Sequence, residues 1–539
     1  MTRPGRRCLN PESMRKLLIL AAALLSAACA EAPQPEINVI PRPLSVEQGD
    51  GAFRLGRSCP IGYDDPALQS VAALCAGYLT EEGERKPVVA DKPVHKGIDL
   101  QLDDTLAGEE YTLSATKKGV SICGGSPRAV LYGVQTLRQL IDGDRVPVVE
   151  IRDEPYFGYR GAMFDVARYF YPVEEVKRFI DIMALHKLNT FHWHLTDDQG
   201  WRIEIKRYPE LTRIGSQRRE TLIGHYKTSD EYDGKPHGGY YTQDEIREVV
   251  AYAAERCIDI IPEIELPGHS MAALASYPWL GCTKGPYEVR TTWYYSSDVL
   301  CAGRETTFEF LENVLTEVLG LFPSKYIHVG GDECPKVRWK ACPDCQRRMH
   351  REGLADEDAL QSYFVCRIEE WLHAHGREMI GWDELLEGGV TPSTIVMSWR
   401  GTEGGIEAAK LGNRVIMAPR FYFYLDYYQT SDPEKNGEPL SIGRNVPIRK
   451  LYGYDPFDRL DEAQSRNILG VQANLWTEYI STMDHAEYML LPRLAAMSEV
   501  AWATERRDYD DFVRRLGSLR GLYDREGYRY ADFVFRGIE

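Results

Sequence analysis

The stretch His328-Val329-Gly330-Gly331-Asp332-Glu333 is the most informative in the chain, because an apolar strand ends there in two glycines and two adjacent carboxylates. Successive side chains of a strand point to opposite faces. Neighbouring acids therefore serve one site only where the backbone leaves strand geometry, which paired glycines permit. Two acids held close together acquire different pKa values, so that one can donate a proton while the other stays ionised and stabilises positive charge. The stretch predicts the catalytic end of a barrel strand.

The sequence around this stretch alternates apolar strands with amphipathic helices, which is the pattern of parallel βα units. Within one of the helical segments, Thr242 and Glu245 are spaced as a capping box, and Tyr241 and Ile246 as a hydrophobic staple. Eight such units predict an α/β protein with a (β/α)8 TIM barrel over residues 157–505, whose active site forms at the carboxyl ends of the strands. The predicted strands are residues 161–166, 190–195, 259–264, 325–329, 378–382, 394–399, 414–418 and 469–475.

Further segments flank the predicted barrel. Residues 36–150 mix short strands with helices and predict a small α+β domain, whose last helix carries Val130, Val134 and Leu137 on one face. Residues 506–539 predict a helical C-terminal tail without functional motifs. Residues 1–30 predict a signal peptide.

The leader predicts an exported protein. Arg15 and Lys16 precede an apolar stretch that is too short to span a bilayer, and Leu25-Ser26-Ala27-Ala28-Cys29 resembles a bacterial lipoprotein box with its leucine one place early. Acylation of Cys29 would give a lipoprotein anchored in the outer membrane. Cleavage after Ala30 would leave the protein in the periplasm or, as a less favoured outcome, fully secreted.

The net charge of −17 disfavours nucleic acid and anionic membrane surfaces as partners and is compatible with a neutral substrate such as a sugar. Cys282 and Cys301 bracket an aromatic loop and are the best candidate pair for a disulfide. Cys342 and Cys345 have the spacing of half a zinc site. Because no second CxxC and no nearby His pair completes four ligands, a structural zinc is the less favoured alternative, and we predict no catalytic metal and no cofactor.

Polar residues recur at the carboxyl end of nearly every predicted strand, where a barrel builds its active site. In strand order, they are Asp165 and Arg168, with Arg160 ahead of the first strand; His192, His194, Asp197 and Asp198; Glu263, Glu265 and His269; Asp332 and Glu333; Trp382, Asp383 and Glu384; Trp399 and Arg400; Tyr424 and Asp426; and Asn474, Trp476 and Glu478.

These motifs together resemble glycoside hydrolase family 20, the β-N-acetylhexosaminidases. The resemblance covers roughly residues 36–502 and rests on 328–333 (HVGGDE), 192–201 (HWHLTDDQGW), 262–269 (PEIELPGH), 381–384 (GWDE), 424–426 (YLD) and 476–478 (WTE). It implies an exo-acting retaining enzyme that removes terminal β-linked GlcNAc or GalNAc from a glycan or glycoconjugate. The sequence alone decides neither between these two sugars nor the oligomeric state.

The resemblance also implies substrate-assisted catalysis, in which the substrate's own 2-acetamido oxygen attacks the anomeric carbon. Glu333 would then act as acid and base, Asp332 would hold the acetamido N–H, and Tyr424 would bind the acetamido oxygen. His269 would tune Glu333 together with one of two adjacent aspartates, for which Asp198 is preferred over Asp197.

The resemblance assigns the remaining site residues to the substrate. Trp382, Trp399 and Trp476 would wall the pocket around the acetamido group. The residues expected to hydrogen-bond the sugar are Arg160, Asp197, Asp426 and Glu478, of which Asp426 and Glu478 lie nearest O4 and O6.

Two other functions remain open from the sequence. A lacto-N-biosidase would keep the chemistry and release a disaccharide, which requires an open pocket floor shaped by residues 213–239 and 281–301. A non-catalytic glycan-binding lipoprotein would keep the barrel as a sugar receptor. The complete acid set of Asp332, Glu333 and His269 argues against the receptor.

Overall fold

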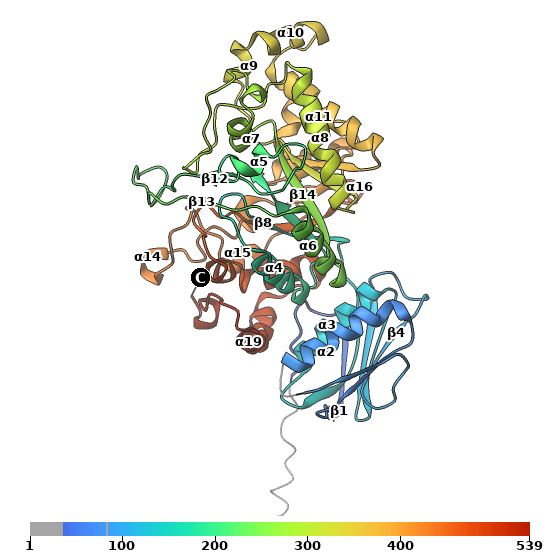
Figure 1. The fold of residues 1–539 in the computed structure, drawn as a ribbon. Helices are drawn as coiled ribbons and strands as arrows, with labels where there is room; N and C mark the ends of the chain where they lie inside the picture. Colours follow the sequence, from blue (N-terminus) through green and yellow to red (C-terminus); the bar gives the residue numbers. More distant parts are fainter. Residues whose placement is uncertain (1–35, 82–84, 539) are drawn as a thin grey trace, which may run out of the picture.

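The computed structural model describes residues 36–81 and 85–538, which form an N-terminal sheet domain and a barrel (Figure 1). The predicted leader, with Cys29, lies outside the described residues. Among the helices of the described segments, none is both long enough and apolar enough to cross a membrane.

The N-terminal domain is a seven-stranded mixed sheet with two helices on one face (Figure 1). Its helix α3 buries Val130, Val134 and Leu137, the face that the sequence predicts, against the sheet. Strand β7 runs to Asp153, past the predicted domain limit at residue 150. The sheet order is β1 (Ser45–Arg54), β7 (Arg145–Asp153), β5 (Tyr111–Thr116), β6 (Gly119–Gly124), β4 (Ile98–Leu102), β2 (Pro60–Tyr63) and β3 (Val88–Ala90), and the helices are α2 (Gln69–Glu81) and α3 (Pro127–Leu140).

The rest of the chain builds a closed barrel of eight parallel strands, which confirms the predicted fold. All eight predicted strands are present, and their ends agree with the prediction to within two residues. The last strand pairs with the first, where Val471 lies beside Arg160. The strands are β8 (Tyr159–Asp165), β9 (Thr190–His194), β14 (Asp259–Leu266), β15 (Tyr326–Gly330), β16 (Glu378–Trp382), β17 (Ile395–Ser398), β18 (Val415–Met417) and β19 (Ile468–Leu475).

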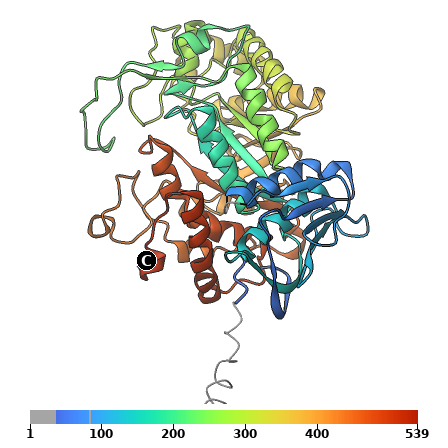
Figure 2. The ribbon, with the colours of Figure 1, turned by 60° about the horizontal axis from the view of Figure 1, so that its bottom comes forward.

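Helices surround the barrel (Figures 1 and 2). The predicted capping box is present at the start of α6, where Thr242 and Glu245 bond reciprocally, and Tyr241 and Ile246 are fully buried. The longer helices are α4 (Val173–Leu185), α6 (Gln243–Glu255), α8 (Glu305–Leu321), α10 (Pro343–Glu352), α11 (Glu357–Ala374), α12 (Glu403–Leu411), α17 (Met483–Leu490) and α18 (Arg493–Trp502). Shorter elements are β10 (Thr196–Asp197), β11 (Gly200–Trp201), α5 (Glu210–Arg213), β12 (Gln217–Arg218), β13 (His237–Gly238), α7 (Met271–Ser276), α9 (Val337–Ala341), α13 (Arg420–Phe423), α14 (Pro433–Asn436), α15 (Ile448–Tyr452) and α16 (Glu462–Ser465).

The tail carries helix α19 (Tyr509–Glu526), which fastens the N-terminal domain to the barrel. Arg514 of this helix donates to Asn38 Oδ1 at 2.7 Å and pairs with Glu36. Arg138 of α3 pairs with Glu526 at the helix end. The start of the described chain is therefore held beside the tail.

Candidate active site

Asp332 and Glu333 follow β15 on a turn that requires glycine. Gly330 and Gly331 have φ angles of 66° and 98°, in the left-handed region. A Cβ on Gly330 would lie 1.8 Å from Glu265 Oε2. Glu333 itself has a φ of 41°, a conformation that costs a non-glycine residue free energy and that clusters at functional sites. The two glycines turn the chain out of strand geometry, as the sequence predicts.

The two acids occupy unlike environments. Asp332 is 7% exposed, whereas the Glu333 side chain is 37% exposed. Burial raises the pKa of Asp332 to about 7; the nearby His269 opposes this rise and the Glu333 carboxylate adds to it. One carboxyl group is therefore deep and the other is accessible from the cavity.

His269 lies between this pair and a buried aspartate. Its Nδ1 is 3.1 Å from Asp197 Oδ1, and its Nε2 is 3.4 Å from Glu333 Oε2 and 3.6 Å from Asp332 Oδ2. Burial alone would lower the pKa of His269, but the carboxylates of Asp197 and Asp332 outweigh it and raise the pKa well above its usual value. The environment of the ring therefore favours its cationic form beside the acid pair.

The partner of His269 is Asp197, which corrects the sequence-based preference for Asp198. Neighbouring side chains of an extended segment point to opposite sides, so only one of the two aspartates bonds the ring. Asp198 instead accepts from the backbone N–H groups of Met271 and Ser296, each at 3.0 Å. Asp197 is buried and lies outside the cavity lining, so its predicted contact with substrate is not supported either.

The predicted sugar contact of Arg160 is wrong, because Arg160 lies at the opposite end of its strand. Its guanidinium is fully buried and donates to Phe157 O at 2.7 Å and Glu109 Oε2 at 3.0 Å. Arg160 is the second residue of β8, and a strand rises roughly 3.3 Å per residue, so most of this strand lies between Arg160 and the cavity. Arg168, beyond the carboxyl end of β8, lines the cavity and pairs with Asp197 at 2.9 Å.

Aromatic rings form one wall of the cavity. Tyr424 lies between Trp399, whose ring is nearly parallel at 6.1 Å, and Trp476, also at 6.1 Å. Trp382, predicted as a third wall residue, is only 1% exposed and donates through Nε1 to Glu263 Oε1 at 2.9 Å. It packs behind Trp476, with ring centroids 6.0 Å apart, and supports the wall instead of lining it.

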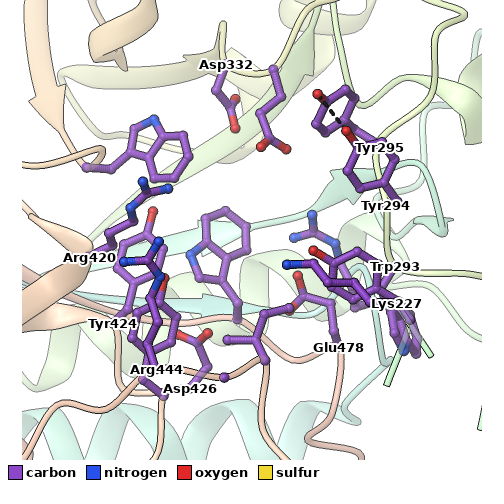
Figure 3. A pocket seen from close by; sticks show the side chains of 18 of the residues that line it. Lys227, Trp293, Tyr294, Tyr295, Asp332, Arg420, Tyr424, Asp426, Arg444 and Glu478 are labelled. Carbon is purple, nitrogen blue, oxygen red and sulfur yellow. Dashed lines mark hydrogen bonds between the residues drawn. The ribbon is translucent and has the colours of Figure 1, made fainter. Parts of the chain in front are cut away.

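Several buried polar atoms of the cavity have no partner among the described residues. They are Asp332 Oδ1, Asp426 Oδ1 and Trp476 Nε1. Asp426 and Glu478 lie across the cavity from Asp332 (Figure 3). Burial raises the pKa of Glu478 to about 7 and that of Asp426 well above its usual value. Because an unpaired buried polar group is costly, this cavity is suited to a ligand rich in hydroxyl and amide groups.

The sequence did not identify all residues of the cavity. The loop between Cys282 and Cys301 contributes three aromatic residues, for which the aromatic content of the loop was the only signal (Figure 3). The cations Lys227, Arg420 and Arg444 gave no signal, because they lie on segments between strands. Arg168, which the sequence indicates only as a polar residue at a strand end, also lines the cavity. The residues added to the predicted set are Tyr226, Lys227, Trp293, Tyr294, Tyr295, Arg420, Tyr427, Ile442, Gly443 and Arg444.

Comparison with known proteins matches both parts of the chain. The family description "Glycosyl hydrolase family 20, catalytic domain" matches residues 157–505, and "Glycosyl hydrolase family 20, domain 2" matches residues 36–154. A β-hexosaminidase of Porphyromonas gingivalis is 44% identical over 95% of this chain and 67% of its own length. A β-hexosaminidase of Vibrio furnissii is 39% identical over 86% of this chain and 76% of its own.

A solved structure extends the likeness to the fold. The family 20 exo-β-N-acetylglucosaminidase of Vibrio harveyi, in complex with N-acetylglucosamine, superposes with a TM-score of 0.82 at 34% identity. The match covers 92% of this chain and 78% of that one.

Proposed function

This chain belongs to glycosyl hydrolase family 20 and is a glycosidase, and from that premise we propose that it removes terminal β-linked N-acetylhexosamine from glycans by substrate-assisted, retaining catalysis. The relatives named β-hexosaminidases support this substrate class. The observation that carries the proposal is the unpaired, buried Asp332 Oδ1 next to the accessible Glu333.

The acetamido group of the sugar fits the deep half of the cavity. Its N–H would satisfy Asp332 Oδ1, and its methyl group would pack on the wall of Trp399, Tyr424 and Trp476. In this pose the acetamido oxygen attacks the anomeric carbon, with the Tyr424 hydroxyl as its hydrogen-bond donor. A wall of this kind also excludes the water that would compete with the intramolecular attack.

Glu333 supplies the proton transfers. It protonates the leaving oxygen as the anomeric bond breaks, and afterwards it removes a proton from the attacking water. Asp332 stabilises the positive charge that develops on the acetamido group. Because an adjacent positive charge favours the ionised carboxylate, the reaction itself lowers the pKa of Asp332 from about 7.

The far side of the cavity supports exo cleavage. Asp426 and Glu478 face Asp332 across a space lined by Arg168, and they would hold the hydroxyls of the terminal sugar (Figure 3). Carboxyl groups in that position close the cavity beyond the terminal sugar, which disfavours release of a disaccharide. With the leader predicted at residues 1–30, we place this activity outside the cytoplasm.

The first test compares two aryl β-glycosides, one of N-acetylglucosamine and one of glucose, as substrates of the purified protein. We expect hydrolysis of the acetamido sugar only. Equal cleavage of both would mean a protein nucleophile and would overturn the assisted mechanism, and cleavage of neither would overturn the proposed substrate class. The aryl β-glycoside of N-acetylgalactosamine is measured alongside. The ratio of its rate to that of the N-acetylglucosamine glycoside gives the preference for the configuration at O4.

Two isosteric variants separate the roles of the two acids. Glu333→Gln should slow substrates with poor leaving groups far more than those with good ones, because good leaving groups need little protonation. Asp332→Asn should slow all acetamido substrates alike. Equal, minor effects of both substitutions would contradict the assignment.

A further inference from the structure

Four cysteines from separate segments meet outside the active site. Cys282 and Cys301 lie in the loop after β14, Cys342 directly precedes α10, and Cys345 is in the first turn of that helix. The Sγ atoms of Cys282 and Cys345 are 3.9 Å apart, those of Cys301 and Cys342 are 3.8 Å apart, and those of Cys301 and Cys345 are 3.7 Å apart. All four Sγ atoms lie within 4.8 Å of one another.

These separations fit one metal ion and do not fit disulfide bonds. Zinc binds thiolates at about 2.3 Å in a tetrahedron, which places the sulfur atoms about 3.8 Å apart. A disulfide requires sulfur atoms at roughly 2.05 Å, and none of the ten described cysteines forms one. The predicted Cys282–Cys301 disulfide is therefore absent from the described structure, and both thiols belong to the four-cysteine cluster.

We propose that Cys282, Cys301, Cys342 and Cys345 bind a structural zinc ion. Four thiolates complete a tetrahedral shell without an open position, which distinguishes a structural zinc from a catalytic one, and soft sulfur ligands select zinc over calcium or magnesium. Binding releases the thiol protons into solution as each sulfur coordinates the metal. The half-site that the sequence shows in Cys342 and Cys345 is completed by two cysteines that lie 41 and 60 residues before Cys342.

The surroundings of the cluster are suited to thiolates. Three of the four cysteines are buried, so water does not compete for the metal. Cys342 and Cys345 lie at the N-terminus of a ten-residue helix, whose dipole favours negative charge. Arg304 pairs with Asp344 at 2.6 Å and donates to Gly281 O at 3.0 Å and Cys282 O at 3.3 Å, which holds the segment of Cys282 against that of Cys342 and Cys345.

The backbone is shaped for this close approach. Gly303 follows Cys301, and a Cβ at its position would lie 2.1 Å from the backbone carbon of Asp344. Only glycine lets this segment lie against the first turn of α10. Trp339 donates to Leu300 O at 2.9 Å and makes a second link between the same two segments.

The zinc would connect two segments that adjoin the active site. The loop between Cys282 and Cys301 carries Trp293, Tyr294 and Tyr295, which line the cavity. Cys342 and Cys345 belong to the segment that follows the catalytic turn. The metal therefore fixes the aromatic side of the cavity relative to the acid pair, without contacting substrate.

Metal analysis of the purified full chain, expressed with its own leader, tests the proposal. We expect one equivalent of zinc per chain and X-ray absorption showing four sulfur neighbours at about 2.3 Å. A zinc-free protein would overturn the proposal, whether its intact mass shows two disulfides or four free thiols. Since zinc content is measured without substrate, this result is independent of the proposed glycosidase specificity.

Cysteine variants locate the metal. Cys282→Ser and Cys345→Ser should lower zinc content to below a tenth of an equivalent, whereas Cys366→Ser, a half-buried cysteine on α11, should keep the full equivalent. Full zinc in either cluster variant would overturn the assignment. If the cluster variants fail to fold, the number of sulfur neighbours of zinc in the unmodified protein, measured by X-ray absorption, tests the assignment instead. Removing zinc from that protein should speed amide exchange in residues 283–300 and raise KM more than it lowers kcat.

Discussion

The two ends of the barrel both bury charge, but they do so with opposite results. At the N-terminal end, Lys187 is fully buried and donates to Tyr111 at 2.8 Å and Asp153 at 3.3 Å, while Arg160 pairs with Glu109. At the C-terminal end, buried atoms such as Asp332 Oδ1 have no partner in the described chain. Burial alone therefore does not mark function in this molecule. Burial without a partner marks it where the atom also belongs to a residue that lines the cavity, as Asp332 Oδ1 and Asp426 Oδ1 do.

The difference has an energetic meaning. A buried charge whose hydrogen bonds are complete is strongly destabilising to break, whereas a buried atom without a partner has already lost its water and gains when a ligand arrives. We expect substitutions at the N-terminal end to lower stability with little effect on activity. Substitutions at the C-terminal end should do the reverse.

The largest expected effect is on activity at the C-terminal end. Asp332→Asn keeps the shape of the side chain and removes its charge, so kcat/KM for an acetamido substrate should fall by about 100- to 1,000-fold, the range for loss of one electrostatic stabiliser. The thermal midpoint should not fall. Steady-state kinetics and calorimetry of the same preparation check both, and a loss of activity below tenfold would contradict the assigned role.

The next effect is on stability at the N-terminal end. Arg160→Met removes a buried guanidinium that pairs with Glu109 and donates to Phe157 O, and the groups left unsatisfied should cost about 1–3 kcal/mol of unfolding free energy. The exposed pair of Arg54 and Asp144 provides the control, because Arg54→Met should cost at most about 1 kcal/mol. Denaturant titration measures both. A large fall in kcat/KM per folded molecule of the Arg160 variant would contradict this assignment and would support a role of Arg160 in sugar binding.

A matched pair of tryptophans sharpens the comparison. Trp502 Nε1 donates to Asp153 Oδ1 at 2.9 Å, whereas Trp476 Nε1 has no partner in the described residues. Trp502→Phe should therefore lower stability by about 1–3 kcal/mol and leave kcat/KM unchanged. Trp476→Phe should lower kcat/KM by roughly tenfold, about 1.4 kcal/mol of transition-state stabilisation, at a smaller cost in stability. Equal stability losses in the two variants would remove the distinction between the barrel ends.

The smallest effect is a dependence of stability on pH. The pKa of Asp332 is about 7 in the folded chain against a reference value of 3.8, so the folded state holds a proton that the unfolded state has lost between these values. Stability of the unmodified protein should therefore fall as pH rises from about 4 to 7, a loss that Asp332→Asn avoids. The difference in thermal midpoint between the two proteins should grow over that window. A constant difference would show that Asp332 is not buried in its neutral form.

The sequence predicts features that depend on local pattern. Apolar runs separated by amphipathic helices predict all eight strands, and the turn at Gly330 and Gly331 follows from residue type. Arg168 was among the polar residues that this pattern places at a strand end, because it lies beyond the carboxyl end of β8, whereas Arg160 lies near the amino end of that strand. The barrel rule alone would have chosen correctly between these two arginines.

Other features depend on contacts between distant segments. To decide which of Asp197 and Asp198 contacts His269, one must know where each side chain points. Two adjacent aspartates in the sequence do not give this direction. Likewise, no spacing rule joins Cys282 to Cys345, because the contact arises only when the loop after β14 packs on α10. Tertiary packing supplies this information.

The pairing of Glu36 with Arg514 on α19 also determines which side of the molecule faces a support to which the start of the described chain is attached. The described chain starts on the side of the N-terminal domain, which contacts the end of β8 remote from the cavity through Glu109 and Arg160. A bead or membrane coupled at this point would face the amino end of the barrel. The open end would stay turned outward, accessible to chain ends of glycans too large to diffuse into a support.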